Sequence, residues 1–534
     1  MSTTTLKHPT IGDVVGDAAS EDVSKYLGIQ YATLADRFSP PQIKEYPQGG
    51  TVDATKHGPQ VLALPNGADF EYTLLQKALE YDRKAVRMSD IDGLNLNIYT
   101  PTAGAATPSS NAGLPVFAFI HGGAFNGGSA SFPAYEMTRV VRLSISRKMP
   151  IIAVSLNYRL GAPGFLYSNE MKEAGYLPNN GLRDQRTALL WLQKHIAGFG
   201  GDPNRVTLMG QSAGAVSTSL QLHSEEPLFE RAIMMSGSSL LLGPVPDAVA
   251  EAGYQKAVRQ LYLDGMDPED RMKTLLEMDG QKLRATLLQG GFSPLPVIDG
   301  DICPTGIDFK SLFDGTLDLA GKKWCKSLIL GDCEFDGTIL GLPLGGRKSG
   351  IAKAFADSIS ASLPEQAATR LLSDYGIPSS SSDEEAFTRV LEFANDICFY
   401  TPTFAFAQGL QDDMPVYMYR FNEPNPWPGP WQGRTSHIHD LVVLLQTFNQ
   451  FMNSEQTQLG EEFAADVVAF VNGQDPWQRW TNEEKIAKVF KVGSERMVQD
   501  APETTERRRT VLDLADSVGF DALKGAFTRF LVGG

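Results

Sequence analysis

The sequence predicts an α/β fold built on a large, mostly parallel central sheet. Short, continuously apolar runs recur along the chain, and each is followed by a turn rich in glycine. Runs of this length are typical of strands that are covered on both faces. Between two of them lies a segment with apolar residues at helical spacing, and strand, helix, strand is the unit of an α/β fold. With 42% hydrophobic residues, the chain can form one large globular unit over residues 1–534.

Four apolar runs mark the expected strands in chain order. They are PVFAFI (115–120) before HGGAFNGG, IIAVSL (151–156) before NYRLGAPG, VTLM (206–209) before GQSAGA, and SLIL (327–330) before GDCEFDG. The segment 181–205 predicts a helix, because apolar residues repeat at helical spacing from Ala188 to Leu192 and Gly198 onward ends the pattern. Ligands in α/β folds bind beyond the carboxyl ends of the strands, so the functional groups are expected in these turns.

Ser212 is the candidate nucleophile. It stands between Gly210 and Gly214 in MGQSAGA, after an apolar strand and before AGAVSTSLQL, which predicts a helix that opens on small residues. A strained turn from strand to helix exposes a serine hydroxyl and leaves room only for glycine on either side. The pattern therefore predicts a nucleophile elbow.

A serine nucleophile needs a base to take its proton and an acid to orient that base. Five of the seven histidines are better explained as structural, and the other two, His437 and His439, follow the late apolar run VYMYRF. The turn GDCEFDG offers three acids after a strand, namely Asp332, Glu334 and Asp336. The residues alone leave both choices open, but the chain order serine, acid, histidine is the one expected of an α/β-hydrolase.

The glycine-rich stretch HGGAF supplies backbone N–H donors for an oxyanion. Glycines after an apolar strand let the main chain approach a reacting carbonyl, which side chains would block. Each such donor lowers the barrier by about 3–4 kcal/mol. A further donor is expected from Ala213, the residue after the nucleophile.

Charge and cysteine content argue against several other classes of protein. The net charge of −16, without a basic patch, disfavours nucleic acids and anionic lipid surfaces as partners. No apolar run reaches the ~20 residues of a membrane span and the N-terminus lacks a secretory signal, so a cytoplasmic protein without a stable membrane anchor is expected. The four cysteines form no C-x-x-C pair, and neither a metal nor an organic cofactor is expected.

Nearly the whole chain resembles the type B carboxylesterase and lipase family, the α/β-hydrolases that include cholinesterases and many fungal esterases. The likeness rests on the ordered stretches YLGIQYA, RFSPP, DATKHGPQ, LNLNIYTP, NYRLGAPGF, GLRDQRTALLWLQKHIAGFGGDPNRVTLMGQSAGA and LFERAIMMSGSS. It implies an α/β-hydrolase fold with helices on both faces of the sheet and long insertions that form a lid and a gorge. In character the chain is closest to the intracellular fungal members.

The resemblance also implies a role for each candidate. The family's acid falls on Asp336, the residue before the glycine in GDCEFDG, and its histidine falls on His437, because Asp440 and Leu441 follow at the family's spacing. The family's oxyanion donors fall on Gly123, Ala124 and Ala213. The implied reaction is attack by Ser212, release of the alcohol, and hydrolysis of the acyl-enzyme by water.

Three departures from the family pattern bear on the substrate. Gly93 replaces a cysteine whose upstream partner is also missing, so the disulfide that would tether a lid-like loop at about 60–92 is absent. Gln211 precedes the nucleophile where cholinesterases have an acid, and the loop has no tryptophan; choline esters are therefore not expected, since a quaternary ammonium needs a carboxylate and an aromatic face. Asp336 replaces the more usual Glu, which keeps Glu334 open as the acid.

We therefore expect a serine hydrolase of uncharged, fairly apolar carboxylic esters, whose partner is a small-molecule ester substrate. Two alternatives use the same residues or the same fold. One is a biosynthetic acyltransferase or cyclase, in which an alcohol or amine takes the acyl group. The other is a non-catalytic, cholinesterase-like binding protein. The sequence leaves open the acyl and alcohol groups, and also whether the chain is a monomer or a homodimer.

Overall fold

A large sheet forms the centre of the structure, a computed structural model that describes residues 3–18, 22–102, 104–105, 113–494, 496–499 and 506–533. Its strands in chain order are β1 (Thr3–His8), β2 (Gly12–Asp17), β3 (Val23–Gln30), β6 (Thr51–Ala54), β7 (Asn95–Pro101), β8 (Leu114–Ile120), β9 (Ile152–Leu156), β10 (Gly201–Gln211), β11 (Arg231–Met235), β12 (Leu328–Cys333), β13 (Val416–Phe421), β14 (Ile486–Phe490) and β15 (Met497–Gln499). Two short strands, β4 (Ala32–Thr33) and β5 (Gln42–Ile43), pair separately.

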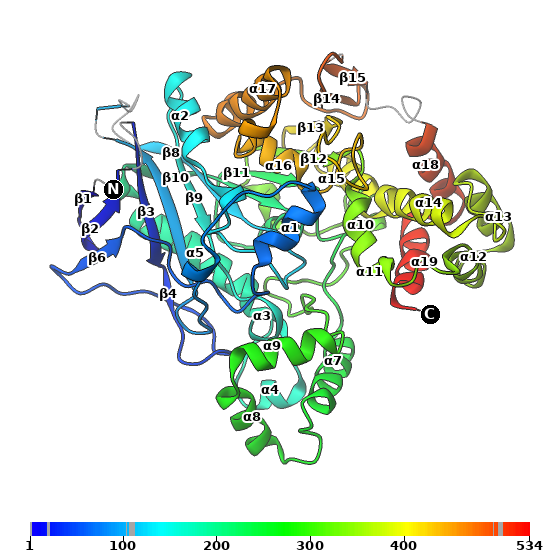
Figure 1. The fold of residues 1–534 in the computed structure, drawn as a ribbon, viewed down its shortest axis with the longest axis horizontal. Coiled ribbons are helices and arrows are strands. Elements are labelled where there is room, and N and C mark those ends of the chain that lie inside the picture. The colour runs from blue at the N-terminus through cyan, green and yellow to red at the C-terminus, as the bar shows by residue number, and fades with distance from the viewer. Residues whose placement is uncertain are drawn as a thin grey trace.

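The strand order is β1-β2-β3-β7-β9-β8-β10-β11-β12-β13-β14-β15, with β6 beside β2 (Figure 1). All neighbours from β9 to β14 are parallel. Antiparallel pairs form the two ends of the sheet. The four expected strands are β8, β9, β10 and β12, and the expected helix is α5 (Asn180–His195). The prediction of a mostly parallel sheet is therefore confirmed.

Helices cover both faces of this sheet. Besides α5, the α-helices are α1 (Gly67–Leu75), α2 (Thr138–Ser146), α3 (Gly161–Phe165), α4 (Asn169–Glu173), α6 (Ala213–Gln221), α7 (Asp247–Gln260), α8 (Pro268–Glu277), α9 (Gly280–Gln289), α10 (Phe309–Phe313), α11 (Gly341–Gly345), α12 (Ile351–Ser362), α13 (Glu365–Asp374), α14 (Asp383–Asn395), α15 (Thr401–Leu410), α16 (His439–Leu444), α17 (Ser454–Val471), α18 (Glu506–Val518) and α19 (Phe520–Val532).

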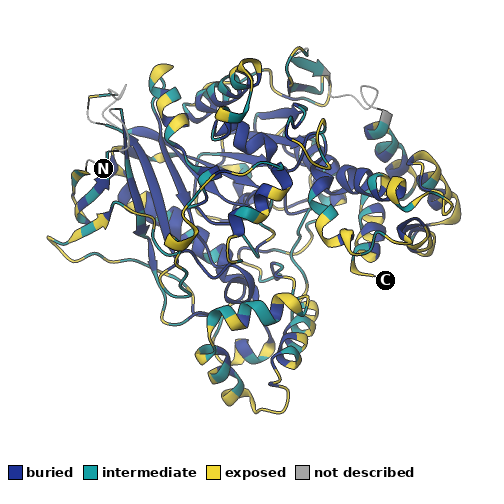
Figure 2. Ribbon diagram, in the orientation of Figure 1, coloured by how far each residue is buried: buried dark blue, intermediate teal, exposed yellow. Residues whose placement is uncertain are grey.

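The alternation of side chains along β8 shows how the two faces are filled. Val116, Ala118 and Ile120 belong to the core that α5 and α6 cover, whereas Phe117 and Phe119 belong to the core that α2 and α17 cover. Successive residues of a strand point to opposite faces, so a wholly apolar strand needs a layer of helices on each side. Figure 2 accordingly shows the central sheet as buried and the outer helices as buried on one side only.

Two helical clusters lie outside these layers. Helices α12, α13, α14, α18 and α19 share a core of their own at the right of Figure 1. Helices α7, α8 and α9 pack with α4 around another core at the bottom of the view. Helices α7, α8 and α9 follow β11 in the chain, helices α12, α13 and α14 follow β12, and helices α18 and α19 follow β15.

The loop at 60–92 contains α1 and is held at its base without a disulfide. Gln60 and Met88 form a β-bridge, and Arg37 pairs with Asp90 at 2.7 Å. A Cβ on Gly93 would lie 2.8 Å from the Cα of Val61, so the two backbones are in close contact at the position where the resemblance implies a disulfide. A cysteine at 93 would need a backbone shift at this point.

The other end of α1 is bonded to the segment that leads to His437. The amide nitrogen of Asn425 donates to the carbonyl of Leu75 at 2.9 Å, and the backbone N–H of Trp431 donates to Oε1 of Gln76 at 2.6 Å. The position of the loop and the position of the candidate base are thereby coupled.

The ionisation of Glu71, on α1, is expected to make the stability of the folded protein depend on pH. Its carboxylate is buried and accepts a hydrogen bond from the Tyr135 hydroxyl at 2.5 Å, and burial raises the pKa of Glu71 to about 7. Because the folded-state pKa lies above the ordinary value, the stabilisation from the neutral form is complete below about pH 4.5 and is lost as the pH rises to about 7. Between pH 5 and pH 8, the free energy of unfolding of the wild type should fall by about 3 kcal/mol because Glu71 ionises. We expect Glu71→Gln to abolish this part of the decrease.

Thermal unfolding of Glu71→Gln at both pH values measures this difference. The matched control is Glu80→Gln, since Glu80 is exposed on the same loop. If both variants lose stability with pH as the wild type does, the ionisation of Glu71 is not responsible.

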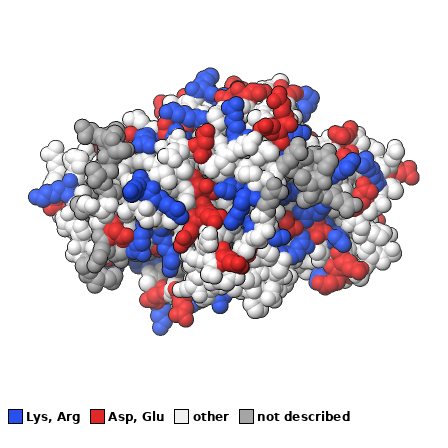
Figure 3. All heavy atoms as spheres, turned by 90° about the horizontal axis from the view of Figure 1, so that it is seen from above, with Lys and Arg blue, Asp and Glu red and all other residues white. Residues whose placement is uncertain are grey.

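The four cysteines, Cys303, Cys325, Cys333 and Cys398, are buried and free, as expected. Among the described residues, no helix is both long enough and apolar enough to cross a membrane. Figure 3 shows basic and acidic side chains interspersed over one face of the molecule.

Candidate active site

Ser212 lies on a strained turn between β10 and α6. Its backbone has φ 57° and ψ −124°, an unfavourable conformation for a residue other than glycine, and its N–H donates to the carbonyl of Met235 at 2.9 Å. A Cβ on Gly210 would lie 2.0 Å from the carbonyl oxygen of Gly214, and a Cβ on Gly214 would lie 2.1 Å from that of Ile120. Both glycines are therefore required by close packing, as the elbow pattern predicts.

Asp336 lies in the turn directly after β12 and is fully buried. The N–H of Cys333 donates to its Oδ2 at 2.8 Å, which directs Oδ1 toward His437. The same turn is also bonded to α14, because the N–H of Gly337 donates to Oδ1 of Asn395, the last residue of that helix, at 3.1 Å. Contacts that do not involve His437 therefore hold the Asp336 carboxylate and its turn in place.

His437 is brought to this carboxylate from a different part of the chain. Its Nδ1–H donates to Oδ1 of Asp336 at 2.6 Å, and its backbone N–H donates to the hydroxyl of Thr338 at 3.0 Å. Its ring lies 5.4 Å from that of Phe399, on the π-helical turn Asp396–Tyr400. The other ring nitrogen, Nε2, accepts a hydrogen bond from the side-chain amide of Gln211 at 3.2 Å, so it lies beside the serine turn.

The remaining candidates have other partners. Glu334 pairs with Arg434 at 3.4 Å, and Asp332 accepts from Arg420 at 2.6 Å and from Arg508 at 3.0 Å. His439 lies at the start of α16 between aromatic rings, and burial lowers its pKa to about 3. Of the three acids in the turn, Asp336 is the one in contact with a candidate histidine.

The loop after β8 presents backbone donors next to this pair. In the described part of the chain, the N–H groups of Gly123 and Ala124 donate to no protein acceptor, and Ala124 is exposed. Ala213 is the first residue of α6, so its N–H has no partner within the helix. His121 secures the loop: its Nδ1–H donates to the carbonyl of Gly122 at 2.9 Å, and its ring stacks on Tyr158.

Burial governs the charges around His437. It raises the pKa of Asp336, and the hydrogen bond from His437 opposes that rise. A second buried carboxyl, Asp440, follows three residues later, and burial together with the charge of Asp336 raises its pKa to about 6. The hydroxyl of Tyr419 donates to Asp440 at 2.7 Å. Two buried carboxyl groups therefore act on one imidazole.

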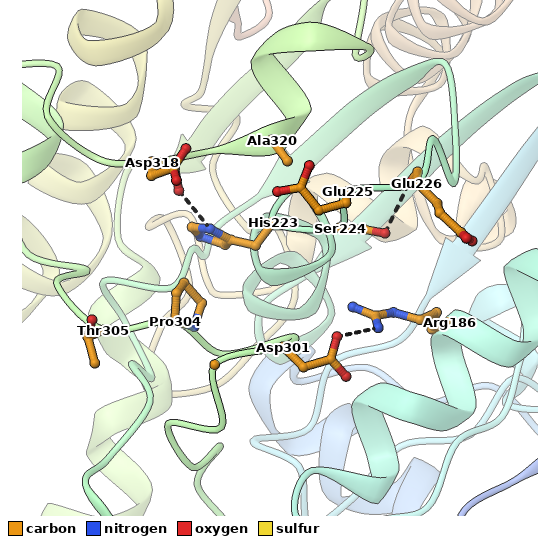
Figure 4. A pocket seen from close by; sticks show the side chains of 11 residues that line it. Arg186, His223, Ser224, Glu225, Glu226, Asp301, Pro304, Thr305, Asp318 and Ala320 are labelled. Atoms are coloured by element: carbon orange, nitrogen blue, oxygen red, sulfur yellow. Dashed lines mark hydrogen bonds and ion pairs between the residues drawn. The ribbon is translucent and has the colours of Figure 1, made fainter.

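A hollow of about 590 Å³ lies apart from this site, beyond the end of α6 (Figure 4). In it Asp301 pairs with Arg186 at 2.7 Å, and the ring of His223 donates to the carbonyl of Asp318 at 3.2 Å. Burial lowers the pKa of His223 to about 4. None of the candidate triad residues lines this hollow. Within the described ranges, no group of three or more His, Cys, Asp or Glu side chains could hold a metal ion.

Three contacts of the site were not anticipated from the sequence. Thr338 and Asn395 hold the histidine and acid turns, and Gln211 contacts the base itself. No local pattern identifies the first two, because each bond joins distant parts of the chain. Gln211 stood out for its neutral side chain, but its partner lies 226 residues away.

Comparisons with known proteins identify the family of the chain. Residues 2–510 match the sequence profile of the carboxylesterase family. The chain is 27% identical over 511 residues to a para-nitrobenzyl esterase of Bacillus subtilis, covering 91% of this chain and 94% of that protein. It is 30% identical over 463 residues to an acylcarnitine hydrolase of Mus musculus, covering 82% and 76%. A solved carboxylesterase of Geobacillus stearothermophilus superposes with a TM-score of 0.74 at 25% identity, covering 95% of this chain and 99% of that one.

Proposed function

The chain belongs to the carboxylesterase family and is an ester hydrolase, and on this premise we propose that it hydrolyses uncharged, fairly apolar carboxylic esters through an acyl-enzyme on Ser212. The observation that carries this proposal is the meeting of three chain segments. The strained serine turn, the hydrogen-bonded pair of Asp336 and His437, and the loop after β8, whose N–H groups have no acceptor among the described residues, all follow the carboxyl ends of strands in the parallel part of the sheet.

In this proposal each group has one task. His437 takes the proton of Ser212 on Nε2 as the serine oxygen attacks the ester carbonyl, and Asp336 holds the ring and stabilises the imidazolium. The N–H groups of Gly123, Ala124 and Ala213 bind the oxyanion of the tetrahedral intermediate. His437 then gives the proton to the departing alcohol, and water releases the acid by the same steps.

The substrate class is inferred from the groups beside His437. Gln211 is neutral and Phe399 is apolar, so neither supplies the negative charge that would hold a cationic alcohol group. The loop at 60–92 is proposed as a lid, because α1 is bonded to the segment that precedes His437. A monomer and a homodimer are equally compatible with this site.

A fluorophosphonate probe and a series of p-nitrophenyl esters test the proposal. We expect covalent labelling of Ser212 in the folded protein and turnover that depends on acyl chain length from acetate to palmitate. Product analysis with an added alcohol separates hydrolysis from acyl transfer. Folded protein that neither reacts with the probe nor turns over any ester would contradict the proposal.

A further inference from the structure

The side chain of Gln211 makes a contact that the proposed mechanism does not use. It is 1% exposed, and its amide nitrogen donates to Nε2 of His437 at 3.2 Å. This is the nitrogen that must take the proton of Ser212. Among the described residues, Nε2 has no hydrogen bond to the serine hydroxyl. The lone pair of the base is therefore occupied by Gln211 in the structure.

The other end of the same carboxamide has no partner. Oε1 of Gln211 is buried and accepts no hydrogen bond from any residue that the structure describes. It lies against the bare side of Gly122, since a Cβ there would be 2.7 Å from Oε1 and 2.9 Å from the Cβ of Ser212. Buried polar atoms are nearly always hydrogen-bonded, so an unpaired acceptor within the site requires an explanation.

We propose that Gln211 is a positioning residue for His437, bonded to the imidazole in both of its protonation states. With the neutral ring, the amide N–H donates to Nε2. When Nε2 has taken the proton of Ser212, it becomes a donor, and the carboxamide turns over so that Oε1 accepts from it. The inference rests on the proposed function for the source of that proton, but not for the contact itself.

The rotation of the Gln211 carboxamide needs no rearrangement of the backbone. The terminal torsion of glutamine is broad and roughly two-fold, so exchanging nitrogen and oxygen costs little in conformational energy. Only glycine at 122 leaves space for the carboxamide in either orientation. Hydrogen bonds to a charged partner are stronger than those to a neutral one, so the contact stabilises the imidazolium more than the neutral base.

Other charged groups act on His437 from its remaining sides. Asp336 binds Nδ1, and Asp440, at the start of α16, acts through its charge. Neither is hydrogen-bonded to Nε2 in the described part of the chain. Gln211 is thus the side chain through which the protonation of Nε2 can be changed without disturbing the acid.

Two substitutions separate donation from acceptance. Gln211→Glu keeps the shape but can only accept and adds a negative charge, so the imidazolium is stabilised. We expect the midpoint of imidazole titration to rise by about one pH unit. Gln211→Met removes both hydrogen bonds, so the midpoint is expected to fall, with kcat lower by about 10- to 100-fold and KM nearly unchanged.

Gln221 provides the matched control. It is also a fully buried glutamine, at the far end of α6, the helix that begins after Ser212. Its amide donates to the carbonyl of Leu182 at 2.9 Å, and among the described residues its Oε1 likewise has no partner. Gln221→Met removes the same groups without touching His437. We expect it to titrate and turn over as the wild type does.

The measurement is the pH titration of the low-field proton resonance of His437 Nδ1–H, followed by NMR in the four full-length proteins and assigned by its loss in His437→Gln. A raised midpoint in Gln211→Glu supports the inference, even if no ester is hydrolysed and the proposed function fails. If Gln211→Met does not fold, Gln211→Glu decides alone. If the titration midpoint of Gln211→Glu equals the midpoints of the wild type and of Gln221→Met, the inference is overturned, whatever the esterase activity.

Discussion

Ser212→Ala is expected to lower kcat by about 10⁶-fold while leaving the fold intact. The estimate follows from the loss of the nucleophile in a site whose other groups act only through it. Residual catalysis should come from the unpaired N–H groups of Gly123 and Ala124 and from substrate binding, which do not need the hydroxyl. Steady-state kinetics on a p-nitrophenyl ester and the melting temperature of the variant measure the two parts of this expectation.

Ser219→Ala is the control for this change. Ser219 lies buried on α6, the helix that follows Ser212. Its hydroxyl donates to the carbonyl of Val216 at 2.7 Å and accepts from the N–H of Ser239 at 2.7 Å, and it makes no contact with His437 in the described part of the chain. It should keep kcat within about fivefold, because neutral hydrogen bonds of about 1 kcal/mol each are lost and neither involves a residue of the site. Activity of Ser212→Ala that stays within tenfold of the wild type would mean that another residue is the nucleophile.

Features with a local cause could be predicted from the sequence. The apolar runs predicted β8, β9, β10 and β12 because strands covered on both faces need apolar residues at every position. Gly210 and Gly214 marked the serine turn because atoms of neighbouring backbones leave no room for a Cβ. Such constraints act within a few residues or on one pair of neighbouring elements.

Features with a distant cause could not be predicted in this way. His437 and His439 are both in a polar loop after the same strand, and only the fold brings one of them to a carboxylate 101 residues away. Helix α12 packs against α19 and helix α13 packs against α18, so their positions depend on contacts between segments far apart in the chain. Periodicity indicates a helix but does not identify its partner.

The assignment of Asp336 rather than Glu334 as the acid depends on a local sequence pattern and on a contact between distant parts of the chain. The variant that tests it has the second largest expected effect. Asp336→Asn is expected to lower kcat by about 10⁴-fold. An asparagine preserves the shape but donates where the carboxylate accepts, so the imidazole is driven toward the wrong tautomer and the imidazolium loses its counter-charge. Because Asp336 is fully buried, no water can replace the lost charge.

Glu334→Gln is the matched comparison, since both acids lie in the same turn. Glu334 is 37% exposed and pairs with Arg434, and an ion pair of this kind contributes about 0–1 kcal/mol, so kcat should change by less than about fivefold. The contrast between the two variants is decisive because each keeps the volume of the side chain and removes one charge. If Glu334→Gln loses far more activity than Asp336→Asn, the loop must rearrange in the working enzyme so that Glu334 reaches His437. In that case the hydrogen bond of 2.6 Å between Asp336 and His437 would belong to a resting state.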